Sequence, residues 1–73
     1  MGARECFEVA GQAAGLLEEM GFVAVARLKG GVVTLEFWRG EQAMRYEFTD
    51  PSVTPRSLAL ACAAEYRERV GDD

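Results

Sequence analysis

The sequence contains no histidine, and only two cysteines and two prolines among its 73 residues. Without histidine the chain lacks the commonest general base, the commonest neutral metal ligand and every Ser-His or Cys-His nucleophile pair. Cys6 and Cys62 lie far apart in the sequence and form no Cys-x-x-Cys metal motif. We therefore expect no catalytic residue, no metal site and no cofactor, and a function other than that of an enzyme.

Long apolar runs are absent as well. No run approaches the roughly 20 residues that a membrane-spanning helix needs. Glu5 and Glu8 interrupt the basic-then-apolar pattern of an export signal. We expect a cytoplasmic protein with no membrane partner, in which Cys6 and Cys62 are reduced and buried as small apolar side chains. A disulfide between the two predicted helices is the second interpretation of these cysteines.

Positive charge is also scarce. The chain has 8 Lys and Arg residues against 12 Asp and Glu residues, which gives a net charge of −4. The charge is −3 over residues 1–21, +1 over residues 22–49 and −2 over residues 50–73. An acidic surface repels phosphate groups, so nucleic acid is an unfavourable partner. With 49% hydrophobic and 27% charged residues the composition is that of a globular protein. The length predicts a single domain over residues 1–73.

What the chain does contain is glycine at two tight turns. Gly30-Gly31 and Gly40-Glu41 each separate two runs in which apolar and polar residues alternate. This pattern is typical of hairpins with two-residue turns. It predicts an antiparallel meander of three strands in the order 1-2-3. The predicted strands cover residues 22–29, 32–39 and 42–49.

A helical segment is predicted on each side of the meander. Residues 3–20 show a 3.6-residue apolar periodicity, and residues 55–70 follow Thr54 and Pro55, which suit the cap and first position of a helix. The fold class is therefore α+β, in the order α-β-β-β-α, with both helices packed on one face of the sheet. The apolar face of the first helix comprises Cys6, Phe7, Val9, Ala10, Ala13, Ala14, Leu16, Leu17 and Met20.

Both hairpin registers place the same residues on the covered face of the sheet, since a slip by one residue would reverse every side chain. These residues are Phe22, Ala24, Ala26, Leu28, Val33, Leu35, Phe37, Met44, Tyr46 and Phe48. Trp38 then falls on the opposite face of the central strand, with Val23, Val25, Arg27 and Arg45 around it.

Trp38 has three interpretations. It covers its own neighbours, or it is the centre of a protein interface, since Trp and Arg dominate binding hot spots. It could also stack an RNA base, with Arg27, Lys29 and Arg45 nearby, although the face carries no second aromatic residue. A smaller apolar pair, Leu60 with Ala64, points away from the core of the second helix and is a candidate homodimer contact.

The α-β-β-β-α order resembles that of the double-stranded-RNA-binding domain. That family grips phosphates with a long first hairpin loop and with lysines at the start of its second helix. Here the loop is only Gly30-Gly31, and the second helix starts with Pro55-Arg56-Ser57-Leu58. A related small toxin family with this element order needs a catalytic histidine. These departures remove the binding and catalytic chemistry that the two families would imply.

The chain also resembles small acidic inhibitors carried by phages, including CRISPR inhibitors with a helix, a three-stranded meander and a C-terminal helix. The resemblance covers the whole chain and lies in length, acidity, layout and lack of catalytic groups. It implies a protein partner whose nucleic-acid-binding surface is occupied by acidic side chains. The residues in question are Glu5, Glu8, Glu18 and Glu19.

The sequence thus predicts a protein-binding module without enzymatic activity, most simply an inhibitor that blocks a basic or nucleic-acid-handling protein. Contact is expected either through the face around Trp38 or through the acidic first helix. The alternative is a structural or assembly protein that acts as a homo-oligomer through Trp38 or Leu60. An RNA-binding module that uses the open sheet face is the second alternative.

Overall fold

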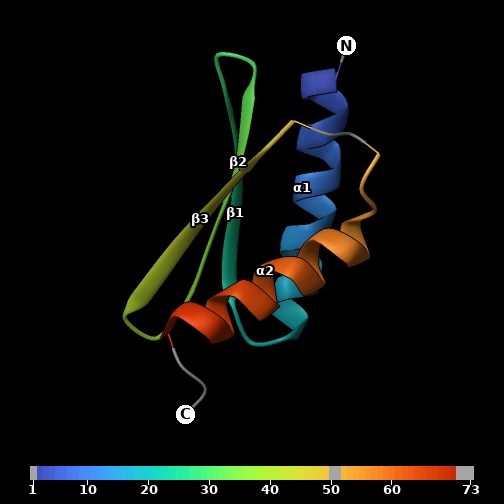
Figure 1. Cartoon of the computed structure of the whole chain (residues 1–73). Coiled ribbons are helices and arrows are strands. Elements are labelled where there is room, and N and C mark those ends of the chain that lie inside the picture. Colours follow the sequence, from blue (N-terminus) through green and yellow to red (C-terminus); the bar gives the residue numbers. More distant parts are fainter. Residues whose placement is uncertain (1, 50–51, 71–73) are drawn as a thin grey trace.

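The computed structural model describes residues 2–49 and 52–70, and the chain follows the predicted order α-β-β-β-α (Figure 1). The predicted domain also includes residues 1, 50–51 and 71–73, which lie outside the described residues. The three strands form one antiparallel sheet in the order β1-β2-β3, so the α+β meander is confirmed. The elements are α1 (Gly2–Glu19), β1 (Val23–Lys29), β2 (Val32–Arg39), β3 (Gln42–Phe48) and α2 (Pro55–Val70).

The two glycine turns fix the strand register. Gly30 and Gly31 both have positive φ, at 58° and 79°, as a type I′ turn requires. Gly40 has a φ of 74° and Glu41 does not share the positive sign, which matches a type II′ turn. The turns pair Lys29 with Val32 and Arg39 with Gln42, in the predicted register.

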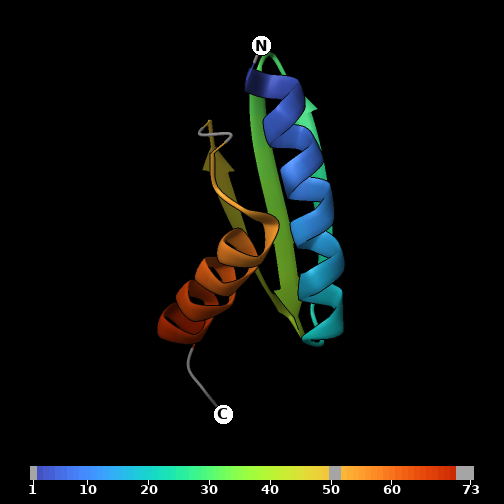
Figure 2. The same cartoon turned by 90° about the vertical axis from the view of Figure 1, so that its right-hand side faces the viewer.

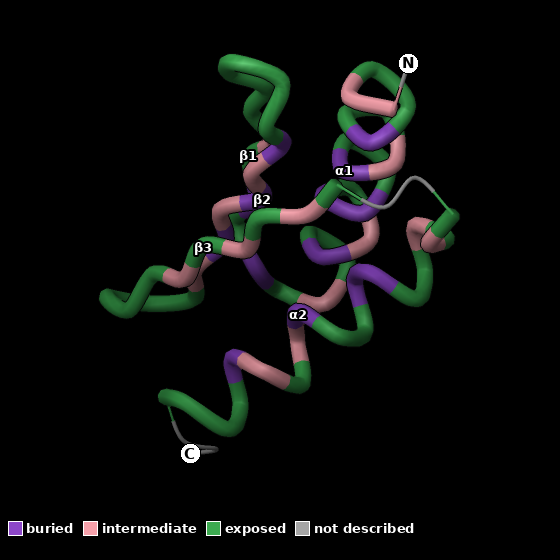
Figure 3. Tube along the Cα trace, turned by 45° about the horizontal axis from the view of Figure 1, so that its top comes forward, coloured by how far each residue is buried: buried purple, intermediate pink, exposed green. Residues whose placement is uncertain are grey.

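Both helices lie on the same side of the sheet (Figure 2). Helix α1 runs along β1 and β2, whereas α2 packs mostly against α1 and reaches the sheet at β3 and, through Tyr66, at the end of β2. The buried residues gather between the helices and the sheet (Figure 3). The largest fully buried side chains are Phe37, Leu17, Leu35, Val33, Cys6 and Cys62.

The end of α1 is closed by a glycine motif and by an arginine from β2. The N–H of Gly21 donates to the Glu18 carbonyl and that of Phe22 to the Leu17 carbonyl, at 3.1 and 3.0 Å. This is the hydrogen-bond pattern of a helix ending on a left-handed glycine, and Gly21 has a φ of 96°. The guanidinium of Arg39 lies 4.2 Å from the centre of the Phe22 ring and donates to the Met20 carbonyl at 2.8 Å.

Helix α2 begins at a threonine cap and is tied to the second hairpin by a tyrosine. The N–H of Ser57 donates to Oγ1 of Thr54 at 3.1 Å, as predicted for a cap at this position. The Tyr66 hydroxyl lies 2.6 Å from the Arg39 carbonyl and 3.0 Å from the Gln42 carbonyl. It also accepts a hydrogen bond from the Arg39 N–H at 3.3 Å, so α2 is fixed to the β2–β3 turn.

Three residues predicted for the core are exposed, and one of them is Val70, the last residue of α2, at 38% exposure. Phe7 on α1 is 38% exposed and Leu28 on β1 is 43% exposed. Both lie toward the end of the molecule that holds the β1–β2 turn, whereas α2 crosses the opposite end (Figure 1). One helix alone covers that end of the sheet, so residues with the correct periodicity still remain in contact with water there.

Candidate functional site: the outer face of the sheet

Both helices cover one face of the sheet (Figure 2), and Trp38 lies on the opposite face because it alternates with the buried Phe37. The two residues next to Trp38 in the strand lie on the helix-covered face. Of these, Phe37 is completely buried beneath the helices, whereas Arg39, at the end of the strand, is exposed. Trp38 pairs with Val23 on β1 and with Ala43 on β3. Trp38 is half-buried.

Two exposed valines extend this apolar area along β1. Val23 is 48% exposed and Val25 is 36% exposed. Val23 lies directly opposite Trp38 and Val25 opposite Glu36. We call Trp38, Val23 and Val25 the Trp38 patch. The structure brings these three predicted partner-binding residues together on one surface.

Charged residues border the Trp38 patch. Nε of Arg27 lies 3.5 Å from Oε1 of Glu36, and this ion pair runs diagonally between β1 and β2. Arg45 lies opposite Glu36 on β3, as the register predicts. The border therefore contains both signs of charge, so the outer face is not a basic surface.

The acidic residues of α1 form a separate surface. Glu5, Glu8, Glu18 and Glu19 are all exposed. They lie on the helix layer, whereas the Trp38 patch lies on the other side of the sheet (Figure 2). Within residues 2–49 and 52–70 none of the four forms an ion pair. The nine predicted partner-binding residues thus divide between two sides of the molecule.

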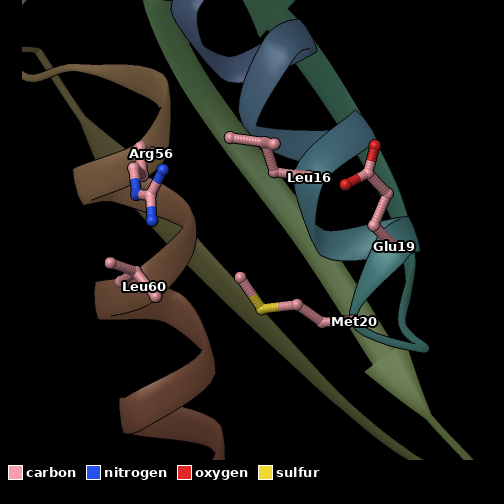
Figure 4. Close-up of a pocket in the computed structure, with 5 residues that line it drawn as sticks. All are labelled: Leu16, Glu19, Met20, Arg56 and Leu60. Carbon is pink, nitrogen blue, oxygen red and sulfur yellow. The ribbon is translucent and has the colours of Figure 1, made fainter.

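A groove that the sequence did not predict lies between α1 and α2 (Figure 4). It has a volume of 410 Å³ and is lined by Leu16, Glu19, Met20, Arg56 and Leu60. Leu60 was predicted to lie off the core and is 53% exposed. Ala64 is also exposed but does not line the groove.

The groove also accounts for two residues of the predicted core face of α1. Leu16 and Met20 are half-buried and line its α1 side. In the sequence, the off-core position of Leu60 was the signal that pointed to this groove. Whether Leu60 lines a groove depends on the angle between the two helices, which the sequence does not give. With three apolar side chains and one charge of each sign, the groove has no pair of groups suited to acid–base chemistry.

The two cysteines are free and buried, and they belong to different clusters of the core. Burial, together with the neighbouring carboxylate of Glu65, raises the pKa of the Cys62 thiol to about 12. Such a thiol stays protonated at neutral pH and is a poor nucleophile. In the described part of the chain no group of three or more Cys, Asp or Glu side chains could hold a metal ion.

No helix among the described residues is both long and apolar enough to cross a membrane. Compared with family models, with curated proteins and with solved structures, the chain shows no significant match to any of them.

Proposed function

We propose that this chain is a protein-binding module without enzymatic activity, and that it inhibits its partner by covering a functional surface of it. The observation that carries the proposal is the Trp38 patch, an apolar area on a sheet face that the chain's own helices leave uncovered. Removal of apolar surface from water is the dominant favourable contribution to most protein–protein association. Trp is also the residue type most enriched in binding hot spots.

The surroundings of Trp38 favour a protein over RNA. Among the described residues of the outer face, Trp38 is the only aromatic side chain, and Glu36 and Glu47 lie on the same face. RNA bound to a sheet normally stacks two or three bases on successive aromatic residues. A mixed border of Arg27, Glu36 and Arg45 instead suits the polar rim of a protein interface.

The acidic surface of α1 supports a basic partner. Its four glutamates are exposed, and within the described residues no cation pairs with them. Such a surface attracts a positively charged protein and raises the rate of association at low salt. This is the specific form of the proposal: an inhibitor that blocks a basic or nucleic-acid-handling protein, comparable in action to a CRISPR inhibitor.

The test is comparative affinity capture from the native host with three forms of the chain. The wild type and Leu60→Ala should retain the same protein, because Leu60 lies away from the outer face and is its matched exposed apolar control. Trp38→Ala should lose that protein while its circular dichroism spectrum stays unchanged. If Trp38→Ala retains every protein that the wild type retains, the Trp38 patch is not the interface.

A second variant tests whether the acidic surface of α1 attracts a basic partner. With the captured protein purified, Glu5→Lys, Glu8→Lys and Glu19→Lys are combined in one chain. Binding should weaken by about tenfold or more at low ionic strength and much less at high salt, because salt screens exposed charges. Equal affinity of this variant and the wild type at low salt would exclude charge attraction through α1.

A further inference from the structure

Strand β3 is an unpaired edge of the sheet. A two-residue turn joins Arg39 to Gln42, so these two residues share the first hydrogen-bonded pair of the hairpin. Because the pattern alternates, the backbone groups of Ala43, Arg45 and Glu47 point away from β2. The strand from Gln42 to Phe48 contains no proline to block the edge. An added strand would find regularly spaced donors and acceptors there.

The inner face of β3 is also incompletely covered. Met44, Tyr46 and Phe48 are each half-buried, and the Tyr46 and Phe48 rings stack at 6.3 Å between centroids. Helix α2 is hydrogen-bonded to β3 at Gln42, where the strand begins. A strand placed beside β3 would cover the apolar side chains that the helices leave partly exposed.

We propose that a second copy of this chain pairs with β3 along this edge, antiparallel and centred on Tyr46. In this register Arg45 lies opposite Glu47 of the second copy, and Glu47 opposite Arg45 of the second copy. On the inner face Tyr46 meets its own counterpart, and Met44 meets Phe48 of the second copy. Opposite charges face each other on one side of the ribbon and apolar side chains on the other.

Charge selects this register from the neighbouring ones. Antiparallel pairing requires that residues with outward backbone groups oppose each other, so the pair is centred on a residue, and extensive overlap of the two strands narrows the centre to Met44, Arg45 or Tyr46. A centre at Arg45 places that guanidinium opposite its own counterpart. A centre at Met44 places Arg45 opposite Ala43 of the second copy and forms no charged pair within the strand. Of the three, only the register centred on Tyr46 forms two complementary charged pairs, and it places no two like charges in direct opposition.

The two α2 helices lie at opposite ends of the joint in this arrangement. The hydrogen bond from Tyr66 places α2 at the Gln42 end of its own β3. In an antiparallel pair the two Gln42 ends lie at opposite ends of the joint, so the two α2 helices are apart. The result is a continuous six-stranded sheet, which leaves both Trp38 patches uncovered on the same outer face. This inference therefore stands independently of the proposed function.

The test is sedimentation equilibrium over a concentration series. The wild type should approach twice the 8.0 kDa mass of the single chain. Arg45→Glu places two carboxylates in direct opposition across the joint, and Glu47→Arg places two guanidinium groups there. Each single variant should therefore dimerise about tenfold more weakly or worse, because like charges directly opposite destabilise a strand pair.

Two further samples restore the charge complementarity. An equimolar mixture of Arg45→Glu and Glu47→Arg should form a heterodimer, and the double variant should dimerise with itself. Thermal unfolding of each variant controls for a change in the fold itself. Trp38→Ala and Leu60→Ala should leave the dimer unchanged, since neither residue lies on β3.

A wild type that remains monomeric throughout the series overturns the proposal. So does a dimer that persists in both single variants, which would indicate another register or another surface. Failure of the mixture to associate, with both variants folded, would likewise exclude the pairing centred on Tyr46. Loss of the dimer in Trp38→Ala would indicate that the contact lies on the outer face, and loss in Leu60→Ala that it lies at the groove.

Discussion

Strands β2 and β3 carry the same alternation of apolar residues but bury it to different extents. On β2, Val33, Leu35 and Phe37 are almost completely buried, at 1%, 0% and 0% exposure. Their direct partners on β3 are Phe48, Tyr46 and Met44, which are only half-buried. The two strands differ in position: β2 is central, whereas β3 is an edge that α2 contacts at its beginning. Burial thus follows from what lies above a strand and beside it, and not from its sequence pattern alone.

The largest expected effect tests this comparison directly. Phe37→Ala should destabilise the protein by about 3–5 kcal/mol, because it removes a fully buried aromatic ring and leaves a cavity. In a chain of this size that loss is expected to unfold much of the population. Met44→Ala, on the residue directly opposite, should cost about 1–2 kcal/mol, since its side chain is already partly in water.

Urea unfolding of the two variants under the same conditions measures both costs. Comparable losses for Phe37→Ala and Met44→Ala would mean that β3 is covered as fully as β2, and the contrast between the strands would be lost. A dimer would raise the cost of Met44→Ala at high protein concentration, so the measurements belong in the dilute range.

The second effect concerns the pH dependence of α2 packing. The folded state holds the Cys62 proton up to a pKa of about 12, whereas the pKa of the unfolded thiol has its ordinary value of 9.0. Above pH 9 the unfolded state therefore binds fewer protons, and stability falls as the pH rises toward 12. The limiting slope for one such group is about 1.4 kcal/mol per pH unit.

Urea unfolding at pH 8, 9, 10 and 11 checks this slope in the wild type and in Cys62→Ala. The variant should be less stable at pH 8 because it leaves a cavity, but it should lose less stability between pH 9 and pH 11. Parallel pH profiles of the two proteins would show that the Cys62 thiol is not responsible for the loss.

The smallest effect sharpens the role of α2 at the start of β3. Tyr66→Phe removes the hydroxyl that lies within hydrogen-bond distance of the Arg39 and Gln42 carbonyls but keeps the ring. The expected cost is about 1 kcal/mol, since one hydrogen bond contributes about that much net. Thermal unfolding should show a midpoint lower by about 4–8 °C. An unchanged midpoint would mean that ring packing alone fixes α2 to the turn.

Most of the fold could be predicted because hairpins with two-residue turns fix their own register. Gly30-Gly31 and Gly40-Glu41 determine every strand pair, and the pairs then decide which face holds Phe37 and which holds Trp38. The observed elements differ from the predicted ones by a single residue at four ends. The helix of residues 3–20 begins at Gly2 and ends at Glu19, β1 begins at Val23 and β3 ends at Phe48.

Most of the remaining errors share one cause. Periodicity defines the apolar face of a helix but not the direction in which that helix crosses its neighbours. Phe7 and Leu28 have core periodicity and are nevertheless exposed, because α2 crosses only the other end of the sheet. The groove around Leu60 depends on the same crossing. The position of Trp38 on an uncovered face could be predicted, whereas the division of the acidic and aromatic residues between two surfaces needed the structure.

Arg39, at the end of β2, contacts both helices α1 and α2. Its side chain closes α1 at Met20 and Phe22, and its peptide groups contact Tyr66 of α2. At the opposite end of the molecule, which holds the start of α1 and the β1–β2 turn, no comparable set of hydrogen bonds joins the elements among the described residues. Thermal opening should therefore run like a hinge, starting at Leu28 and Phe7 and reaching Arg39 last.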